Sequence, residues 1–263
     1  MSDTYETLAI ARHDKVLTVT LNRPDVGNAF DGTMIQELMQ LFSALPADPH
    51  VHVVVIAGAG KSFCAGADIR WMRSQGSLGK AENVTDALRT ANFFEAVDAC
   101  PKPIVGRIHG PARGGGVGLV AAIDIPVGSV GASFALTEVR LGLAPSIISP
   151  YVIRKIGARW ARELFLTGEK VEAARALEVG LLNYVMPDDA ALDAKVDEIV
   201  KMLLQGGPRA LGACKDLART IGGMEPAEAT VKTANLIAEL RASPEALEGM
   251  RAFLTKDKPA WTK

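Results

Sequence analysis

The sequence predicts an α/β protein with a helical C-terminal region. Two observations support this fold class. Apolar runs of β type alternate with helical spacing up to about Pro187, and only helical spacing follows. In addition, two glycine-bracketed segments, 62–68 and 109–116, each follow a β-type run and lead into a helix. At 263 residues, with 48% hydrophobic and 22% charged residues, the chain has the composition of an ordinary globular protein.

The elements follow in order from these periodicities. Residues 17–21 alternate as a strand does and end at the turn signal Asn22-Arg23-Pro24. From Asp31 to Pro46 the apolar positions have the spacing of an amphipathic helix. The same criteria predict further strands at 51–56, 103–108 and 123–127 and further helices at 87–97 and 158–166. Between them, residues 74–83 contain two glycines and predict a mobile loop.

The C-terminal region reads as helix throughout, and Ser243 is expected to cap its last helix. The expected helices are 191–204, 208–220, 227–242 and 244–254. We therefore divide the chain into a core, 1–190, and a helical region, 191–263. Because the helical region has little core of its own, we expect it to pack on a partner subunit.

Charge and composition exclude several classes of protein. With 29 basic and 30 acidic residues, the net charge of −1 gives no general attraction to nucleic acid or to an anionic membrane. No apolar run approaches the roughly 20 residues of a membrane span. The first residues are polar and acidic, unlike a signal peptide, so a cytoplasmic location is expected.

The three cysteines indicate neither a disulfide framework nor a metal site. They lie far apart, at positions 64, 100 and 214, and match no metal-ligand spacing. Cys64 lies inside the first glycine segment, but no histidine is paired with it in a motif, which argues against a nucleophilic role. We expect a reduced protein without a bound metal.

The two glycine segments predict chemistry on an acyl group. Glycines leave the backbone bare, so an N–H group from each segment could donate to one developing negative oxygen. The second segment carries Gly114-Gly115-Gly116 at the expected start of a helix, where the positive end of the helix dipole favours an anion. Close packing of a helix on a strand is the alternative explanation for these glycines. Both explanations remain open at this point.

Together these segments resemble the crotonase (enoyl-CoA hydratase/isomerase) superfamily over nearly the whole chain. The resemblance rests on motifs in the right order: Leu21-Asn22-Arg23-Pro24, Asn28-Ala29-Phe30, Phe63-Cys64-Ala65-Gly66-Ala67-Asp68, Gly114-Gly115-Gly116, Asp124, Glu138, Gly142 with Pro145, Gly180-Leu181 with Val185, and Phe253 with Lys256. It implies a spiral of β-β-α turns followed by a helical trimerisation region. The implied assembly is a homotrimer or a dimer of trimers.

The resemblance also implies roles for individual residues. The backbone N–H groups of Ala67 and Gly115 would form the oxyanion hole for a thioester carbonyl. Coenzyme A would be the carrier of the acyl substrate, with no permanently bound cofactor. The positions that line the CoA site in the family are here Lys61, Ala65, Asp68, Ile69, Phe253 and Lys256. The last two often come from a neighbouring subunit.

One departure from the family pattern concerns catalysis. Hydratases of the family use two glutamates; the second is present as Glu138, but the first position is Gly118. The leading hypothesis is a 2-enoyl-CoA hydratase in which Glu138 transfers the proton and water occupies the space beside Gly118. An enoyl-CoA isomerase using the same glutamate is the alternative. A non-catalytic acyl-CoA-binding homologue is the third hypothesis.

The finer resemblance is to bacterial methylglutaconyl-CoA and carboxygeranoyl-CoA hydratases. It implies a branched or carboxylated acyl group, such as 3-methylglutaconyl. Arg113 is the first candidate to pair with a second carboxylate, and Arg140 is a weaker one. A solvated loop arginine is the alternative interpretation of Arg113. Trp71 and Met72 are expected to shape the acyl pocket or to pack.

Overall fold

The structure is a computed structural model and describes residues 5–262. Its main sheet has the strand order β1-β2-β3-β4-β6-β9, in which β1 and β2 are antiparallel and the other neighbours are parallel. A smaller sheet has the order β5-β7-β8. The strands are β1 Leu8–His13, β2 Val16–Leu21, β3 Val53–Gly58, β4 Ile104–Ile108, β5 Ala112–Arg113, β6 Ile125–Ser129, β7 Ser133–Ala135, β8 Val171–Glu172 and β9 Tyr184–Met186.

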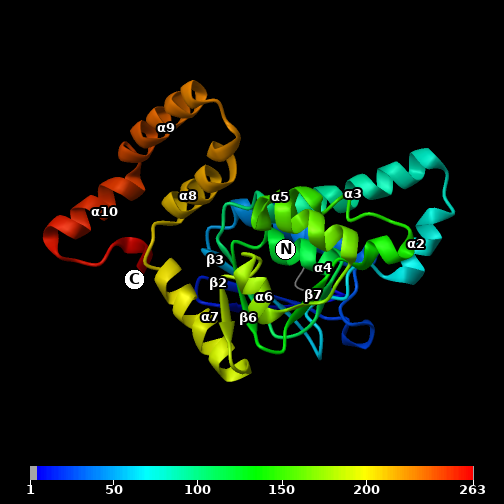
Figure 1. Cartoon of the computed structure of the whole chain (residues 1–263). Coiled ribbons are helices and arrows are strands. Elements are labelled where there is room, and N and C mark those ends of the chain that lie inside the picture. The colour runs from blue at the N-terminus through cyan, green and yellow to red at the C-terminus, as the bar shows by residue number, and fades with distance from the viewer. Residues whose placement is uncertain (1–4, 263) are drawn as a thin grey trace.

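Helices surround the main sheet and continue beyond it into the C-terminal region (Figure 1). The α-helices are α1 Gly32–Ala44, α2 Ile69–Gly76, α3 Lys80–Asp98, α4 Gly115–Ala122, α5 Ser149–Thr167, α6 Ala173–Glu178, α7 Asp189–Leu203, α8 Pro208–Thr220, α9 Pro226–Arg241 and α10 Pro244–Thr255. Short 3-10 helices are η1 Pro24–Val26, η2 Leu45–Ala47, η3 Thr137–Leu141, η4 Ile221–Gly223 and η5 Ala260–Thr262. The predicted α/β class is confirmed, and each predicted strand and helix is present with shifted ends.

The central strands β3, β4 and β6 of the main sheet are buried on both faces, which explains their continuous apolar runs. In β3, Val54 and Ile56 face the larger core with the helices α1, α3, α4 and α5. Val53 and Val55 face the opposite way, into a smaller core that contains Leu192 and other side chains of α7. This alternation fixes the register of β3, because a shift by one residue would exchange its two faces.

Helix α7 belongs with the core rather than with the C-terminal region. The division at 190/191 separates it from the sheet, but its buried residues Leu192, Val196 and Ile199 pack on β3, β4 and β6. The apolar spacing of α7 resembles that of the helices after it, so the sequence does not reveal which surface it covers. The first helix after α7 is α8, whose N-cap is Gly207.

Helices α8, α9 and α10 form an arm that extends away from the sheet (Figure 1). The arm leaves large apolar side chains in solvent, including Phe253 at 84% and Leu254 at 80% exposure. As predicted, the Ser243 side chain caps α10 by accepting a hydrogen bond from the Ala246 N–H. Helix α8 is tied to the core by Lys215, which forms an ion pair of 2.8 Å with Asp124.

The expected mobile loop at 74–83 is wrong, because most of this segment is helical. Helix α2 runs to Gly76 and α3 begins at Lys80. The connection is stabilised by polar caps: the Glu82 carboxylate accepts a hydrogen bond from the Gly79 N–H, and the Ser77 hydroxyl donates to the Ser74 carbonyl. Within residues 5–262, no helix combines the length and hydropathy of a membrane span.

The ion pair between Lys215 and Asp124 predicts how firmly the arm is attached. Asp124 also accepts a hydrogen bond from the Ile104 N–H on β4, so Lys215→Ala would leave a mostly buried carboxylate without its cation. We expect a loss of about 1–3 kcal/mol in the free energy of unfolding and faster proteolysis within α8. Chemical denaturation measures the first effect and limited proteolysis the second. Lys201→Ala, an exposed lysine on α7, is the control, and equal effects of both variants would contradict the prediction.

Candidate active site

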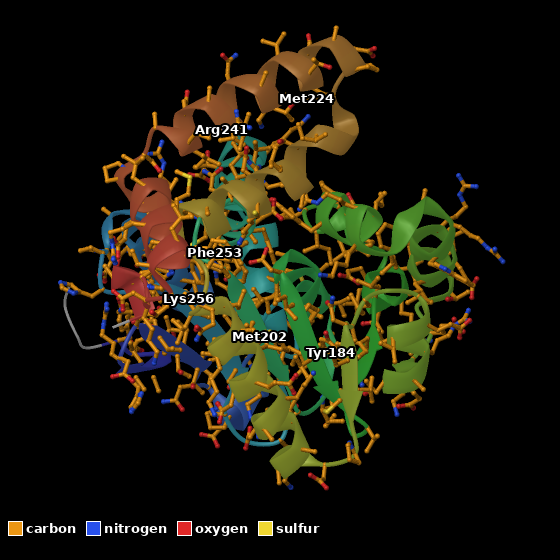
Figure 2. All side chains as sticks on the ribbon, turned by 90° about the vertical axis from the view of Figure 1, so that its left-hand side faces the viewer. Tyr184, Met202, Met224, Arg241, Phe253 and Lys256 are labelled. Carbon is orange, nitrogen blue, oxygen red and sulfur yellow. The ribbon has the colours of Figure 1, made fainter. Side chains whose placement is uncertain are left out.

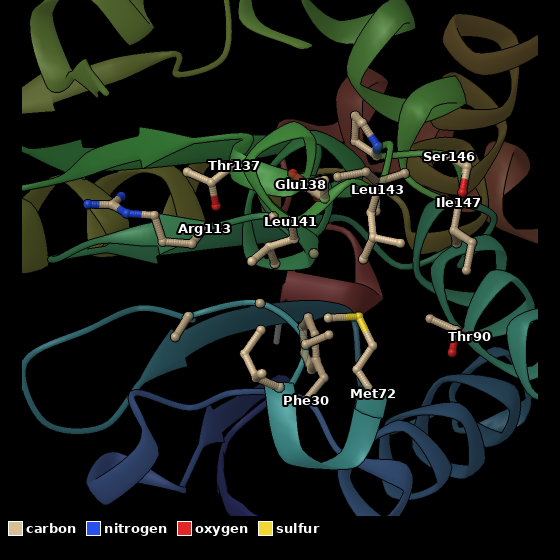
Figure 3. Close-up of a pocket in the computed structure, with 18 of the residues that line it drawn as sticks. Phe30, Met72, Thr90, Arg113, Thr137, Glu138, Leu141, Leu143, Ser146 and Ile147 are labelled. Carbon is tan, nitrogen blue, oxygen red and sulfur yellow. The ribbon is translucent and has the colours of Figure 1, made fainter. Parts of the chain in front are cut away.

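A cavity of about 280 Å³ lies where the two glycine segments meet. Figure 3 shows Glu138, Leu141 and Leu143 on one side of it and Phe30 and Met72 on the other. Most of the lining is apolar, and Glu138 is the acidic residue among the lining side chains. A carboxylate in an apolar cavity is a common arrangement for proton transfer.

The two glycine segments approach so closely that side chains cannot fit between them. The Arg113 N–H donates to the Cys64 carbonyl over 2.9 Å. A Cβ at Gly66 would lie 2.6 Å from the Arg113 carbonyl oxygen, and one at Gly116 would lie 2.3 Å from the Cys64 carbonyl oxygen. Gly66 also has φ +89°, which disfavours any other residue. Close packing therefore explains these two glycines.

The approach leaves two N–H groups free at the cavity. The segment pairs with Phe30 through the Gly66 carbonyl and the Asp68 N–H, which leaves the Ala67 N–H unused. Gly115 is the first residue of α4, so its N–H has no partner within the helix. Among residues 5–262, no acceptor is recorded for either group. Both residues line the cavity, and the arrangement offers two backbone donors at the positive end of a helix.

Asn28 holds the first of these segments in place, and our sequence analysis assigned it no role. Its side chain is buried; its amide donates to the carbonyls of Ala59 and Ser62, each over 2.8 Å, and its carbonyl accepts from the Arg23 N–H. The Arg23 guanidinium in turn pairs with Asp68 at 3.3 Å. The sequence contains one sign of this role: Asn28 is a polar residue in the motif 28–30, which follows the apolar strand predicted at 17–21.

Glu138 lies beside the start of α4, at the beginning of η3. A Cβ built on Gly114 would lie 3.0 Å from its Oε1, so glycine at the N-cap makes room for the carboxylate. Its Oε2 is buried, and no hydrogen-bond partner for it lies within the described part of the chain. Burial raises the pKa of Glu138, and a hydrogen bond from its own backbone N–H offsets only part of that rise. The carboxyl group is therefore easier to protonate than an exposed glutamate, which suits it to exchange a proton with a substrate.

The expectation that water occupies the space beside Gly118 is wrong. A Cβ on Gly118 would lie 2.2 Å from Cγ2 and 2.6 Å from Cβ of Ile148, and 3.3 Å from a ring carbon of Phe94. Ile148 thus fills the volume that a side chain at position 118 would need. Gly118 itself is buried and does not line the cavity. Sequence spacing could not reveal this, because Ile148 lies in another element.

The residues expected at the CoA site fall into two groups. Ala65 and Ile69 line the cavity, with Ile69 57% exposed, and Asp68 is the N-cap of α2. Lys61 is exposed on the loop before them. The Asp68 side chain caps α2. Burial tends to raise its pKa, but the N–H groups of Trp71 and Arg70 and the Arg23 guanidinium hold it below the ordinary value.

The second group, Phe253 and Lys256, lies on the arm and not at this cavity. Figure 2 places both residues at the end of α10. Lys256 is the C-cap of that helix in the left-handed conformation, with φ +55°. The structure does not bring them together with Ala67 and Gly115 within one chain.

The candidate arginines do not present free guanidinium groups to the cavity. Arg113 donates to the carbonyls of Ala112 and Ser133 and to the Ser133 hydroxyl, which ties β5 to β7. Figure 3 shows its side chain pointing away from Glu138. Arg140 is exposed at the end of η3, outside the cavity lining. Trp71 and Met72 are half-buried and both line the cavity, as expected.

Cys64 is a packing residue. It is fully buried, its thiol donates to the Asn28 carbonyl, and burial raises its pKa to about 12. A thiol of this kind is not a nucleophile near neutral pH. In the part of the chain that the structure describes, no group of three or more His, Cys, Asp or Glu side chains is placed to hold a metal ion.

Comparison with known proteins identifies the family of this chain. Residues 11–263 match the enoyl-CoA hydratase/isomerase family. The chain is 37% identical to the enoyl-CoA hydratase ACTT6 of Alternaria alternata, covering 82% of this chain and 69% of that protein. It is 30% identical to the 2,3-dehydroadipyl-CoA hydratase of Escherichia coli, covering 96% and 97%. The crystal structure of an enoyl-CoA hydratase from Shewanella pealeana superimposes with a TM-score of 0.93 at 35% identity, covering 98% of this chain and 97% of that one.

The chain therefore belongs to the enoyl-CoA hydratase/isomerase family, and it has the crotonase fold with a helical C-terminal region. It is an enzyme of that family.

The contact between Gly118 and Ile148 predicts a strong coupling between the two positions. Alanine is favoured over glycine inside a helix by about 1 kcal/mol, but overpacking a rigid core costs about 1–3 kcal/mol. We expect the clash at 2.2 Å to dominate, so Gly118→Ala should destabilise the protein. Ile148→Ala in the same chain should relieve that penalty, giving a favourable coupling energy in a double-mutant cycle measured by denaturation.

Gly131→Ala is the matched control, because its Cβ would approach no atom closer than 3.7 Å. If Gly118→Ala were as stable as the wild type, the close contact with Ile148 would be disproved.

Proposed function

We propose that this protein is a hydratase that adds water to a 2-enoyl-CoA. One observation carries the proposal: the Glu138 carboxylate, with a buried oxygen that lacks a partner among the described residues, shares a cavity with the free N–H groups of Ala67 and Gly115. Acyl-CoA is then the substrate, with CoA as its carrier and no permanently bound cofactor. On the sequence grounds above, we place the enzyme in the cytoplasm.

The proposed mechanism uses one carboxylate twice. The thioester carbonyl oxygen accepts hydrogen bonds from Ala67 and Gly115, which stabilises negative charge on that oxygen as the reaction proceeds. Glu138 removes a proton from water while the water oxygen bonds to the β-carbon and the double-bond electrons move toward the carbonyl. The protonated Glu138 then returns that proton to the α-carbon. The sum of the steps is the addition of one water.

The packing around Gly118 supports a mechanism in which Glu138 is the single catalytic acid and base. With Ile148 in the volume beside Gly118, the attacking water would be activated by Glu138, the acidic residue that lines the cavity. No second carboxylate lines the cavity to orient that water. We therefore expect slower turnover than a two-acid site would give.

We further propose that the CoA portion is completed by a neighbouring subunit. Lys61, Ala65, Asp68 and Ile69 would hold it from one chain, and Phe253 and Lys256 from the arm of the next. The exposed apolar side chains of the arm support a homotrimer or a dimer of trimers, because such a surface is stable when a partner covers it. They are Val231, Ile237, Leu247, Met250, Phe253 and Leu254.

An enoyl-CoA isomerase is the second candidate, and the single carboxylate favours it. Moving a double bond requires one base that removes a proton and returns it nearby, which Glu138 alone can do. Mass distinguishes the two reactions, since isomerisation leaves the mass unchanged. A non-catalytic acyl-CoA-binding homologue is disfavoured by the carboxylate that remains beside the oxyanion hole.

For the acyl group, we propose a branched or carboxylated chain, such as 3-methylglutaconyl. Leu141, Leu143 and Met72 give the cavity walls that suit hydrocarbon branches. A relative with 30% identity is named for a substrate, 2,3-dehydroadipyl-CoA, that carries a carboxylate at the far end of the acyl group. Arg113 is already engaged with Ser133, so a substrate carboxylate needs another partner.

Product analysis tests the reaction and the role of Glu138. We expect a gain of one water on 2-enoyl-CoA substrates, and a fall in kcat of about 10²–10⁴-fold in Glu138→Gln, because the amide cannot accept the proton. Mass spectrometry of the products, with 3-methylglutaconyl-CoA and 3-enoyl-CoA in the same panel, is the measurement. A mass-neutral shift of the double bond would replace the hydratase by the isomerase. Unchanged activity in Glu138→Gln would exclude both reactions as assigned.

The pKa of Glu138 predicts the pH dependence of the reaction. The base acts as the carboxylate, so activity is present above its pKa and falls as the pH drops through it. Because burial raises this pKa, the acid limb of kcat/KM should lie above the ordinary glutamate value of about 4.3. Glu82→Gln, which alters a helix cap outside the cavity, should leave the limb in place. A limb at or below 4.3 would contradict the assignment.

A further inference from the structure

A second cavity adjoins the first across a thin wall. It has a volume of about 350 Å³ and lies between α1 and α3. Ile35, Trp71 and Thr90 line both cavities, so these three side chains form the wall between them. We call the second cavity the distal chamber, because it lies beyond the wall from Glu138.

The movable part of the wall is Trp71, which belongs to a weakly anchored helix, whereas Ile35 is a buried residue of α1. Helix α2, which carries Trp71, has no buried residue, and the buried residues of α3 begin at Phe93. The indole of Trp71 packs against the backbone of Gly32, where a Cβ would lie 3.4 Å from Nε1. A helix without buried residues shifts at low cost. An acyl chain that outgrows the first cavity can therefore extend past Trp71 into the distal chamber.

The distal chamber is polar where the first cavity is apolar. Gln36 and Gln40 of α1 and Asp86 and Arg89 of α3 line it. Arg89 forms no recorded hydrogen bond or ion pair with any residue in 5–262, and neither does the Asp86 carboxylate. Arg89 thus offers its donors to a ligand, in contrast to Arg113, whose guanidinium is engaged with Ser133.

We propose that the distal chamber binds the terminal carboxylate of the acyl group. This inference rests on the proposed function, and it assigns to Arg89 the partner role that the sequence had suggested for Arg113. Arg89 would pair with the carboxylate, and the side-chain amides of Gln36 and Gln40 would donate to it. The substrate class is a 2-enoyl-CoA with a carboxylate at the far end of a chain long enough to pass the wall. This favours a longer chain over the short 3-methylglutaconyl group, whose carboxylate is one CH2 from the β-carbon.

The charges explain why the carboxylate binds there and not beside the reacting carbons. In the first cavity it would meet the Glu138 carboxylate among apolar side chains. In the distal chamber it meets a cation and amide donors, although Asp86 weakens the attraction. Asp86 therefore limits the preference for a charged end, and its removal should strengthen that preference.

The test compares pairs of 2-enoyl-CoA substrates of equal length, one ending in a carboxylate and one in a methyl group, over a series of chain lengths. The ratio of their kcat/KM values measures the preference. Because Arg89 is exposed, we expect Arg89→Gln to lower the ratio roughly fivefold to tenfold for the longer chains. Asp86→Asn should raise it severalfold, and Arg162→Gln, an exposed arginine on α5, should leave it unchanged. Arg162→Gln should also leave activity on the methyl-ended substrates equal to that of the wild type.

Binding measurements separate this inference from the proposed reaction. Titration calorimetry with saturated acyl-CoA ligands of the same lengths, ending in a carboxylate, an amide or a methyl group, requires no turnover. Tighter binding of the carboxylate that is lost in Arg89→Gln would support the chamber even if no water were added. Equal binding of the carboxylate and the amide, or a preference that survives Arg89→Gln, would overturn it.

Discussion

The close contact between two backbone segments is the constraint on which the rest of this structure depends. The Arg113 N–H and the Cys64 carbonyl join the segments, and glycines at 66 and 116 permit the contact. This contact sets the first turn of α4 beside the segment that carries Ala67. The buried amide of Asn28 and the ion pairs of Arg23 hold the same loop from its other side. The donors at the cavity are thus set by packing before any ligand arrives, which is the condition for strong electrostatic stabilisation.

Sequence patterns were sufficient to predict those structural features that depend only on residues close together in the chain. The alternation of residues 17–21, the cap at Ser243 and the glycine segments are local, and each is present in the structure. The position of Glu138 in the family motifs predicted that it transfers the proton. The structure adds two features that the sequence does not contain: a buried Glu138 oxygen without a partner among residues 5–262, and a pKa raised by burial.

Features that depend on distant contacts could not be predicted in this way. The spacing of residues 191–204 predicts one more helix of the arm. In the structure this helix, α7, instead covers the second face of the main sheet. Arg113 stands beside the glycines in sequence, yet its guanidinium turns to Ser133, twenty residues later. The segment 74–83 contains glycines typical of a loop, but the caps from Glu82 and Ser77 make most of it helical. In each case a contact that local spacing does not encode decides the outcome.

The filled volume beside Gly118 has a consequence for how this branch of the family can change. A glutamate at position 118 would collide with Ile148, and a smaller residue at 148 would open a hole beside Phe94 while glycine remained at 118. Each single step toward a two-acid site therefore passes through a less stable protein. A one-acid and a two-acid arrangement at this place are therefore separated by two coupled substitutions, at positions 118 and 148. Because each single substitution destabilises the protein, this barrier disfavours the gain of a second acid at position 118. The site would then keep to chemistry that one carboxylate can perform.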